Sequence, residues 1–127
     1  MSFGGVVVDT QLMPSTGGWQ TWVTQTGEIT LVAGEQTMRL DFIGGQVNIN
    51  WIELISPVSE ILIEAEDFID SGEVQIEASA DEGGGENVGF TDPGDFLEYT
   101  VNIPSDGTYT IQYRLAGQND SDGFETS

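Results

Sequence analysis

The sequence contains neither cysteine nor histidine among its 127 residues. Without cysteine the fold has no disulfide and the chain has no thiol nucleophile. Without histidine it lacks the commonest general base and the commonest zinc ligand. No apolar run is long enough to cross a membrane as a helix, and no signal peptide is recognisable at the N-terminus. A length of this order predicts a single domain, with a core held together by packing alone.

Basic side chains are almost as scarce. Arg39 and Arg114 are the only two, compared with 22 acidic residues, and the formal net charge is −20. Binding to nucleic acid or to anionic lipid requires many Lys and Arg side chains, so we expect neither partner. Sulfated and uronic-acid polymers are disfavoured for the same reason. Neutral polymers and divalent cations remain as ligands, while most of the acidity is explained as a solvated surface that keeps the protein soluble.

Apolar and polar residues alternate over whole segments of the chain, for example in residues 38–42, 97–103 and 109–115. This period of two is typical of strands with one buried face. Turn-forming residues separate the segments, as at 33–35, 92–94 and 104–107. No segment of helical length has a period near 3.6. The sequence predicts about ten strands and an all-β, antiparallel sandwich.

Five short motifs closely resemble a family 6 carbohydrate-binding module: TGGWQTW at 16–22, NINWIE at 48–53, IEAEDF at 63–68, GGGENVGF at 83–90 and GDFLEY at 94–99. In that family the IEAEDF-like motif opens the domain and the NWIE-like motif closes it, so the order here is reversed. The resemblance implies a circularly permuted β-jelly roll.

Under this interpretation residues 1–127 form one module. Residues 1–55 match the family's C-terminal half, residues 61–127 match its N-terminal half, and 56–60 is the joining linker. Permutation requires the original ends to lie close together. The alternative is a fragment that spans two successive modules, whose chains exchange halves as a dimer. We expect a monomer, with the half-exchanged dimer left open.

Four residues are candidates for contacting a sugar. Trp19 follows two glycines in a segment without apolar alternation, which indicates an exposed indole. The resemblance implies that Trp19, Asn48, Glu77 and Phe90 line the main sugar cleft, with Phe90 in a place where the family usually has tyrosine. Aromatic stacking contributes about 1 kcal/mol per ring beyond area burial. The structural alternatives are a Trp19 packed on its own loop, an Asn48 in a turn, a solvated Glu77 and a Phe90 in the core.

A second, less favoured set consists of Phe96, Trp22 and the turn at 92–95. Some members of the resembled family use a site on the concave face, and these residues match it. Phe96 replaces a frequent tryptophan there, which weakens this prediction.

Glu64 and Glu66 are two residues apart on a predicted strand, so both carboxylates are expected on one face. Carboxylates this close repel each other unless solvent or a cation intervenes. Oxygen ligands without His or Cys suit calcium. The resemblance implies a structural Ca²⁺ held by Glu64, Glu66 and Asn50, where the family commonly has Asp in place of Asn50. The alternative is a pair of solvated glutamates.

The resemblance implies non-catalytic binding of a neutral polysaccharide of the agarose, laminarin/β-glucan or xylan class. The module would target a secreted parent glycoside hydrolase to its substrate outside the cell. Two alternatives stay open. One is a calcium-stabilised module for protein interaction or adhesion. The other is a small glycosidase using paired carboxylates, for which abundant acidic residues are a non-specific signal.

Overall fold

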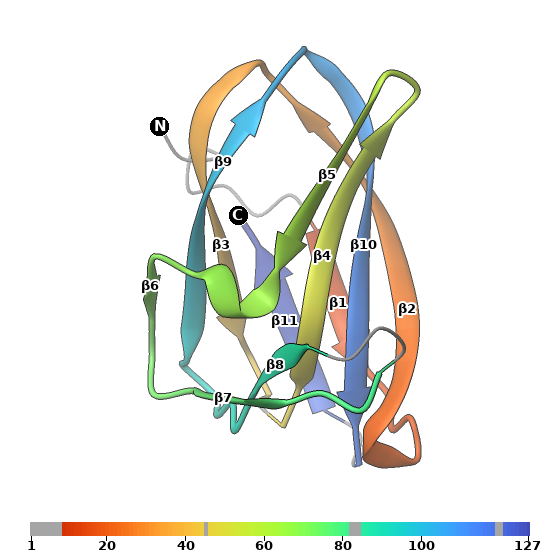
Figure 1. The fold of residues 1–127 in the computed structure, drawn as a ribbon, viewed down its shortest axis with the longest axis vertical. Coiled ribbons are helices and arrows are strands. Elements are labelled where there is room, and N and C mark those ends of the chain that lie inside the picture. The colour runs from red at the N-terminus through yellow and green to blue at the C-terminus, as the bar shows by residue number, and fades with distance from the viewer. Residues whose placement is uncertain (1–8, 45, 82–84, 119–120) are drawn as a thin grey trace.

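The structure is a computed structural model that describes residues 9–44, 46–81, 85–118 and 121–127. Two antiparallel sheets face each other, which confirms the predicted β-sandwich (Figure 1). One sheet has the strand order β1 (Asp9–Met13), β11 (Ser121–Thr126), β3 (Gly34–Phe42), β9 (Phe96–Ile103) and β6 (Asp70–Ser71). The other has the order β2 (Gly18–Leu31), β10 (Gly107–Gly117), β4 (Asn48–Ser56), β8 (Glu86–Gly89) and β7 (Gln75–Ala78), and β5 (Ser59–Glu64) also pairs with β4.

The core lies between the sheets and is built by the alternation seen in the sequence. Every second residue of β3 and β9 is buried, as the period of two requires. Phe124 of β11 packs edge-on against Tyr113, with ring centroids 4.9 Å apart, and also contacts Phe42. The buried hydroxyl of Tyr99 donates to the Ala65 carbonyl oxygen at 2.7 Å, so this polar group is satisfied inside the core.

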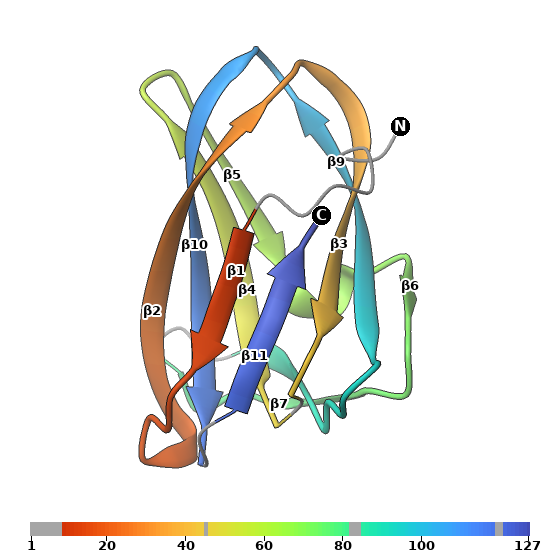
Figure 2. The ribbon, with the colours of Figure 1, turned by 180° about the vertical axis from the view of Figure 1, so that it is seen from behind.

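Each sheet contains strands from both halves of the chain. Strands β1 to β4 precede the predicted junction and β5 to β11 follow it, yet they alternate as neighbours, for example β11 with β3 and β10 with β4. Figure 2 shows β1 and β11 side by side at one edge of the five-stranded sheet. Neither half can therefore complete a sheet of this sandwich by itself.

The junction is a tight hairpin between β4 and β5. Ser56 pairs with Ser59, and the Ser56 hydroxyl accepts hydrogen bonds from the backbone N–H groups of Val58 and Ser59. The connector is shorter than the predicted linker 56–60, because all but residues 57 and 58 of it belong to strands.

One strand prediction is wrong at its end. β5 stops at Glu64, and the segment Ala65–Asp67 forms a short 3₁₀ helix, η1. Glu64 and Glu66 therefore do not lie two apart on one strand, and the argument that placed both carboxylates on the same face fails. The strand ends here because Ala65 is buried in the core and its carbonyl oxygen accepts a hydrogen bond from the Tyr99 hydroxyl.

Several connections gather at one end of the sandwich, at the bottom of Figure 1. The starts of β2 and β4, the whole of β7 and the end of β8 all lie there. Residues 83 and 84 of the predicted GGGENVGF motif lie outside the described residues. In the part of the chain that is described, no helix has the length and apolarity needed to span a membrane.

Candidate functional site

A cleft of about 390 Å³ opens at this end of the sandwich. Its volume lies within the roughly 300–1,000 Å³ usual for small-molecule sites. All four residues predicted to contact a sugar line it, although they come from β2, β4, β7 and the segment after β8. The complete lining is Trp19, Gln20, Gln46, Asn48, Glu77, Phe90, Thr91 and Asp92.

Two aromatic side chains, Trp19 and Phe90, line the cleft. Trp19 is 39% exposed and Phe90 is 61% exposed. The other aromatic residues with described burial are buried or half-buried, and these two exposed rings line the same cleft. The alternative that Phe90 is an ordinary core residue is wrong. The two rings offer flat apolar faces to a ligand.

Four side chains form what we call the polar cluster: Gln20, Asn48, Glu77 and Asn87. Glu77 Oε1 accepts from the amide nitrogens of Asn87 at 3.0 Å, Asn48 at 3.3 Å and Gln20 at 3.5 Å. Asn48 Nδ2 also donates to the Trp19 carbonyl oxygen at 2.7 Å. Glu77 is thus held in one orientation and is not a freely solvated charge.

Gly89 makes room for the polar cluster. A Cβ atom at this position would lie 2.8 Å from Asn48 Oδ1 and 2.9 Å from Glu77 Oε1. Cβ atoms in proteins essentially never approach other atoms this closely. A larger residue at 89 would push Asn48 and Glu77 apart. The glycine of the NVGF sequence is therefore required by the close approach of the backbone to these side chains.

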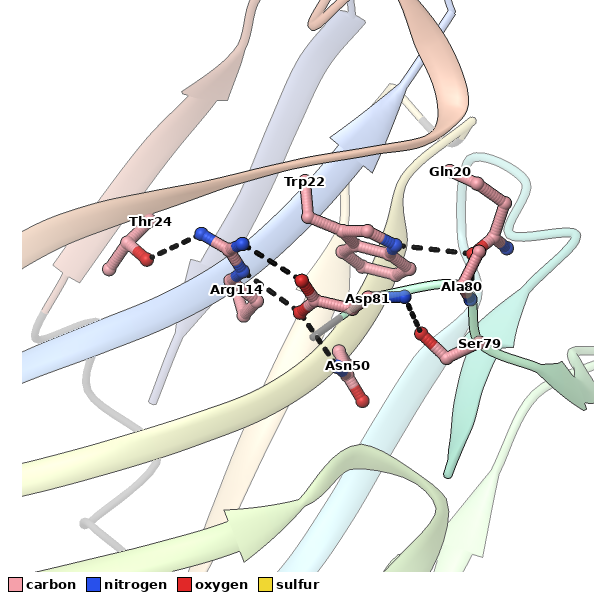
Figure 3. Close-up of polar contacts among 8 residues, drawn as sticks. All are labelled: Gln20, Trp22, Thr24, Asn50, Ser79, Ala80, Asp81 and Arg114. Atoms are coloured by element: carbon pink, nitrogen blue, oxygen red, sulfur yellow. Dashed lines mark hydrogen bonds and ion pairs between the residues drawn. The ribbon is translucent and has the colours of Figure 1, made fainter. Parts of the chain in front are cut away.

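Gln20 links the polar cluster to the β7–β8 connection. Its Oε1 accepts from the Trp22 indole N–H at 3.1 Å and from the Ala80 backbone N–H at 2.7 Å. Its Nε2 donates to Glu77 and to Asn87 Oδ1. Figure 3 shows Gln20 and Trp22 side by side on β2, with Ala80 on the facing connection. Gln20 therefore holds both the connection and the carboxylate of the cleft.

Phe90 is held in the left-handed region of backbone conformation, with φ at 58°. A bulky residue rarely adopts this conformation, which costs on the order of 1–2 kcal/mol. Its neighbour Thr91 is fixed by β-sheet-like contacts: the Thr91 hydroxyl accepts from the Val47 N–H and donates to the Val47 carbonyl, and Gln46 N–H donates to the Thr91 carbonyl. These hydrogen bonds hold the residue next to Phe90 in place, while the Phe90 ring itself is exposed.

A buried ion pair supports the cleft from the side. Asp81, whose side chain is 5% exposed, accepts from Arg114 Nε and Nη2 at 2.9 and 2.8 Å. Asn50 Nδ2 donates to the same carboxylate at 2.9 Å (Figure 3). Arg114 also donates to the Thr24 hydroxyl. This network ties the β7–β8 connection to β2, β4 and β10.

The predicted metal ligands lie beside η1 and β4. Glu64 ends β5 opposite Trp51, and Glu66 lies in η1. Glu66 Oε1 is buried and has no hydrogen-bond partner among the residues that the structure describes. Burial raises the pKa of this carboxyl, and Glu64 and Asp67 raise it further. The amide nitrogen of Asn50 is turned to Asp81, and no group of three acidic side chains placed to hold a metal occurs among the described residues.

The second predicted set does not come together. Trp22 lies on β2 of the six-stranded sheet, whereas Phe96 begins β9 of the other sheet. The Phe96 ring lies 4.0 Å under the Arg39 guanidinium, which in turn pairs with Asp41 and Glu98. Phe96 and Trp22 therefore belong to separate parts of the surface.

Three groups of the site escaped the sequence analysis: Gln20, Asn87 and the pair Asp81–Arg114. For Gln20 a signal existed, because it shares a strand face with Trp22 and Thr24 by the period of two. Asn87 lies inside the NVGF motif but is fully buried. Asp81 is one of many acidic residues, and its partner is 33 residues away in sequence.

Comparison with known proteins gives two findings. The model of the carbohydrate binding module family 6 matches residues 2–56 and 64–127, with the break at the β4–β5 hairpin. The chain is also 33% identical over 129 residues to the clotting factor G alpha subunit of Tachypleus tridentatus. That match covers 93% of this chain but 19% of the relative's length. No solved structure matches the chain.

Proposed function

The chain belongs to the family 6 carbohydrate-binding modules, and from this premise we propose that it binds a neutral polysaccharide in the cleft between Trp19 and Phe90. Carbohydrate binding itself follows from the family, whose members are non-catalytic. The polymer is of the agarose, laminarin/β-glucan or xylan class. The module targets a secreted parent glycoside hydrolase to that polymer outside the cell.

One observation carries this proposal: two exposed aromatic rings and a fixed carboxylate from distant parts of the chain line the same cleft. A sugar ring has an apolar C–H face and a hydroxyl edge. The indole and the phenyl ring match the face, and Glu77 and Asn48 match the edge. An open cleft of this kind binds in the millimolar to micromolar range, about −4 to −8 kcal/mol.

Replacing Trp19 with alanine is expected to weaken polysaccharide binding at least about fivefold, because the loss of one stacking ring costs about 1 kcal/mol or more. Affinity electrophoresis in gels containing agarose, laminarin or xylan measures the effect as lost retardation. Leu62→Ala is the matched control, since Leu62 is 56% exposed on β5 and does not line the cleft.

The same samples separate the alternative functions. Release of reducing sugar that follows the purified protein would identify a glycosidase and overturn the proposal. Retardation that is equal for the wild type and Trp19→Ala would place binding elsewhere. Absence of retardation in every neutral polymer would favour the protein-interaction module.

The proposal includes a structural Ca²⁺ held by Glu64, Glu66 and Asn50. The support is Glu66 Oε1, a buried oxygen to which no donor in the described part of the chain is bonded. Asn50 uses its amide nitrogen on Asp81 and keeps its Oδ1, which points away from Asp81 in Figure 3. When bound, Ca²⁺ would supply the positive charge that these oxygens lack.

Glu66→Gln is expected to stabilise the calcium-free protein at neutral pH and to abolish stabilisation by calcium. The pKa of Glu66 is raised in the folded state, so the unfolded chain loses its proton first as the pH rises. The free energy of unfolding therefore falls as the pH rises. This loss begins near the unfolded pKa of about 4.3 and is complete above the folded pKa. In the wild type, Ca²⁺ at 100 times its Kd adds about 2.7 kcal/mol to the free energy of unfolding.

Thermal unfolding with calcium and with a chelator measures both effects. Glu60→Gln is the control, because it removes one exposed carboxylate of β5 and should keep the calcium response of the wild type. A wild-type protein whose unfolding temperature is the same with calcium and with chelator would contradict the site.

A further inference from the structure

The amide donors of the polar cluster are turned to partners within the protein or are buried. Gln20 Oε1 faces two groups that can only donate, the Trp22 indole and the Ala80 backbone N–H, so its Nε2 must point at Glu77 and Asn87. Asn87 Oδ1 then accepts from Gln20, and Asn87 Nδ2 donates to Glu77. Gln20 has no amide hydrogen left for a ligand, and the second amide hydrogen of Asn87 belongs to a fully buried residue that does not line the cleft.

Asn48 is the third amide side chain of the polar cluster. Its two amide hydrogens go to the Trp19 carbonyl and to Glu77 Oε1. Asn48 is 4% exposed and lines the cleft, so its Oδ1 is a nearly buried acceptor at the cleft surface. Glu77 is half-buried and also lines the cleft, and its Oε2 is a second acceptor, since within the described residues no donor contacts either atom. The polar cluster thus presents acceptors and no donors.

The charge of the cleft also favours a ligand that donates hydrogen bonds. Glu77 and Asp92 both line it, and the chain has no lysine. The two arginines are committed elsewhere, Arg39 to Asp41 and Glu98 and Arg114 to Asp81, and neither lines the cleft. Among the described residues, the charge of Glu77 is met by side-chain amides and by no cation. A cation between the Trp19 and Phe90 rings would also gain from their electron-rich faces.

We infer that the cleft prefers a sugar that carries a protonated amine over the same sugar with a hydroxyl or an N-acetyl group in that place. An ammonium has three donors and no acceptor, which fits the acceptors that the polar cluster presents. A hydroxyl can donate once, whereas an acetyl carbonyl brings an acceptor against acceptors. The inference rests on the proposed function, because it concerns the ligand of the same cleft.

Three β-1,4-linked tetramers test the inference, since glucosamine, glucose and N-acetylglucosamine differ only at C2. Calorimetry at about pH 6, where an amine is protonated and a glutamate is ionised, and at about 0.15 M salt measures their affinities. We expect the glucosamine tetramer to bind about tenfold more tightly than the glucose tetramer, because hydrogen bonds to charged groups are the stronger ones. The N-acetylated tetramer is expected to bind most weakly.

Glu77→Gln is the diagnostic variant, because it replaces one oxygen of the acceptor pair with a donor and removes the charge. The preference for the amine is expected to fall to within about twofold. Glu73→Gln removes the same charge from an exposed residue that does not line the cleft, and it should keep the full preference.

Equal affinities for the three tetramers, the reverse order, or no binding of the glucosamine tetramer would overturn the inference. So would a glucosamine tetramer that binds the wild type and Trp19→Ala equally, because that result indicates adhesion to the acidic surface. If neutral polysaccharides still bind through Trp19 in these cases, the proposed function stands and this inference alone fails.

Discussion

Replacing Asp81 with alanine is expected to lower the free energy of unfolding by about 3 kcal/mol, the lower end of the range for breaking a buried ion pair. The substitution leaves Arg114 without its bidentate partner and Asn50 Nδ2 without an acceptor. Arg114 keeps 25% of its side chain exposed, so solvent offsets part of the loss. For a domain with a total stability of about 5–15 kcal/mol, this is a large share.

Asp41→Ala provides the matched comparison within the same molecule. Asp41 also pairs with an arginine at 2.8 Å, but the side chains of Arg39 and Asp41 are 38% and 46% exposed. An exposed pair contributes about 0–1 kcal/mol. Urea denaturation of both variants measures the difference. Equal losses in the two variants would contradict the view that burial decides the contribution of each pair.

Binding is expected to suffer with Asp81→Ala as well, although Asp81 does not line the cleft. The Asp81–Arg114 pair fixes the connection between β7, which carries Glu77, and β8, which carries Asn87. Once this connection is released, the polar cluster has to be ordered again by the ligand. A variant that loses stability but binds with wild-type affinity would show that Gln20 alone holds the connection.

Replacing Phe90 with glycine is expected to change stability and binding in opposite directions. The left-handed conformation of residue 90 costs a bulky residue about 1–2 kcal/mol, and glycine adopts it without strain. Glycine increases the entropy of the unfolded chain by about 0.5–1 kcal/mol, which offsets part of the gain. Because the ring is already 61% exposed, little buried area is lost. The net expectation is a gain of about 0.5–1 kcal/mol.

The same substitution should weaken polysaccharide binding about thirtyfold. The missing ring removes a stacking contribution of about 1 kcal/mol. The more flexible backbone must be ordered when the ligand binds, which costs about 1 kcal/mol more. Phe90→Ala is the control: it lacks the ring but keeps the strained conformation, so it should lose affinity without gaining stability. A Phe90→Gly protein less stable than the wild type would show that the ring contributes more to packing than its exposure indicates.

The strands and the cleft residues were predictable, and for different reasons. Alternation along β3, β9 and β10 is set by local geometry, because successive side chains on a strand point to opposite faces. Trp19 and Phe90 were identified through short motifs. The lack of apolar alternation around Trp19 also indicated that its indole is exposed. The exposure of Phe90 depends on a left-handed backbone conformation, which the alternation of apolar residues does not reveal.

What failed depended on tertiary contacts. The expectation for Glu64 and Glu66 assumed a strand that continues, but the chain turns into η1 where Ala65 is buried and bonded to Tyr99. Asp81 resembles every other acidic residue until the fold brings Arg114 to it. A local pattern cannot identify a residue by a partner that is distant in sequence.

The β4–β5 hairpin lies at the end of the sandwich opposite to the cleft, and Val58 at its tip is 80% exposed. A protease cut there would leave two fragments that remain interlocked through shared sheets. The peptide bond at 57–58 mainly raises the effective concentration of one half for the other. It therefore governs how quickly the halves assemble far more than the shape they adopt, and longer insertions at this tip should be tolerated without disturbing the ligand end.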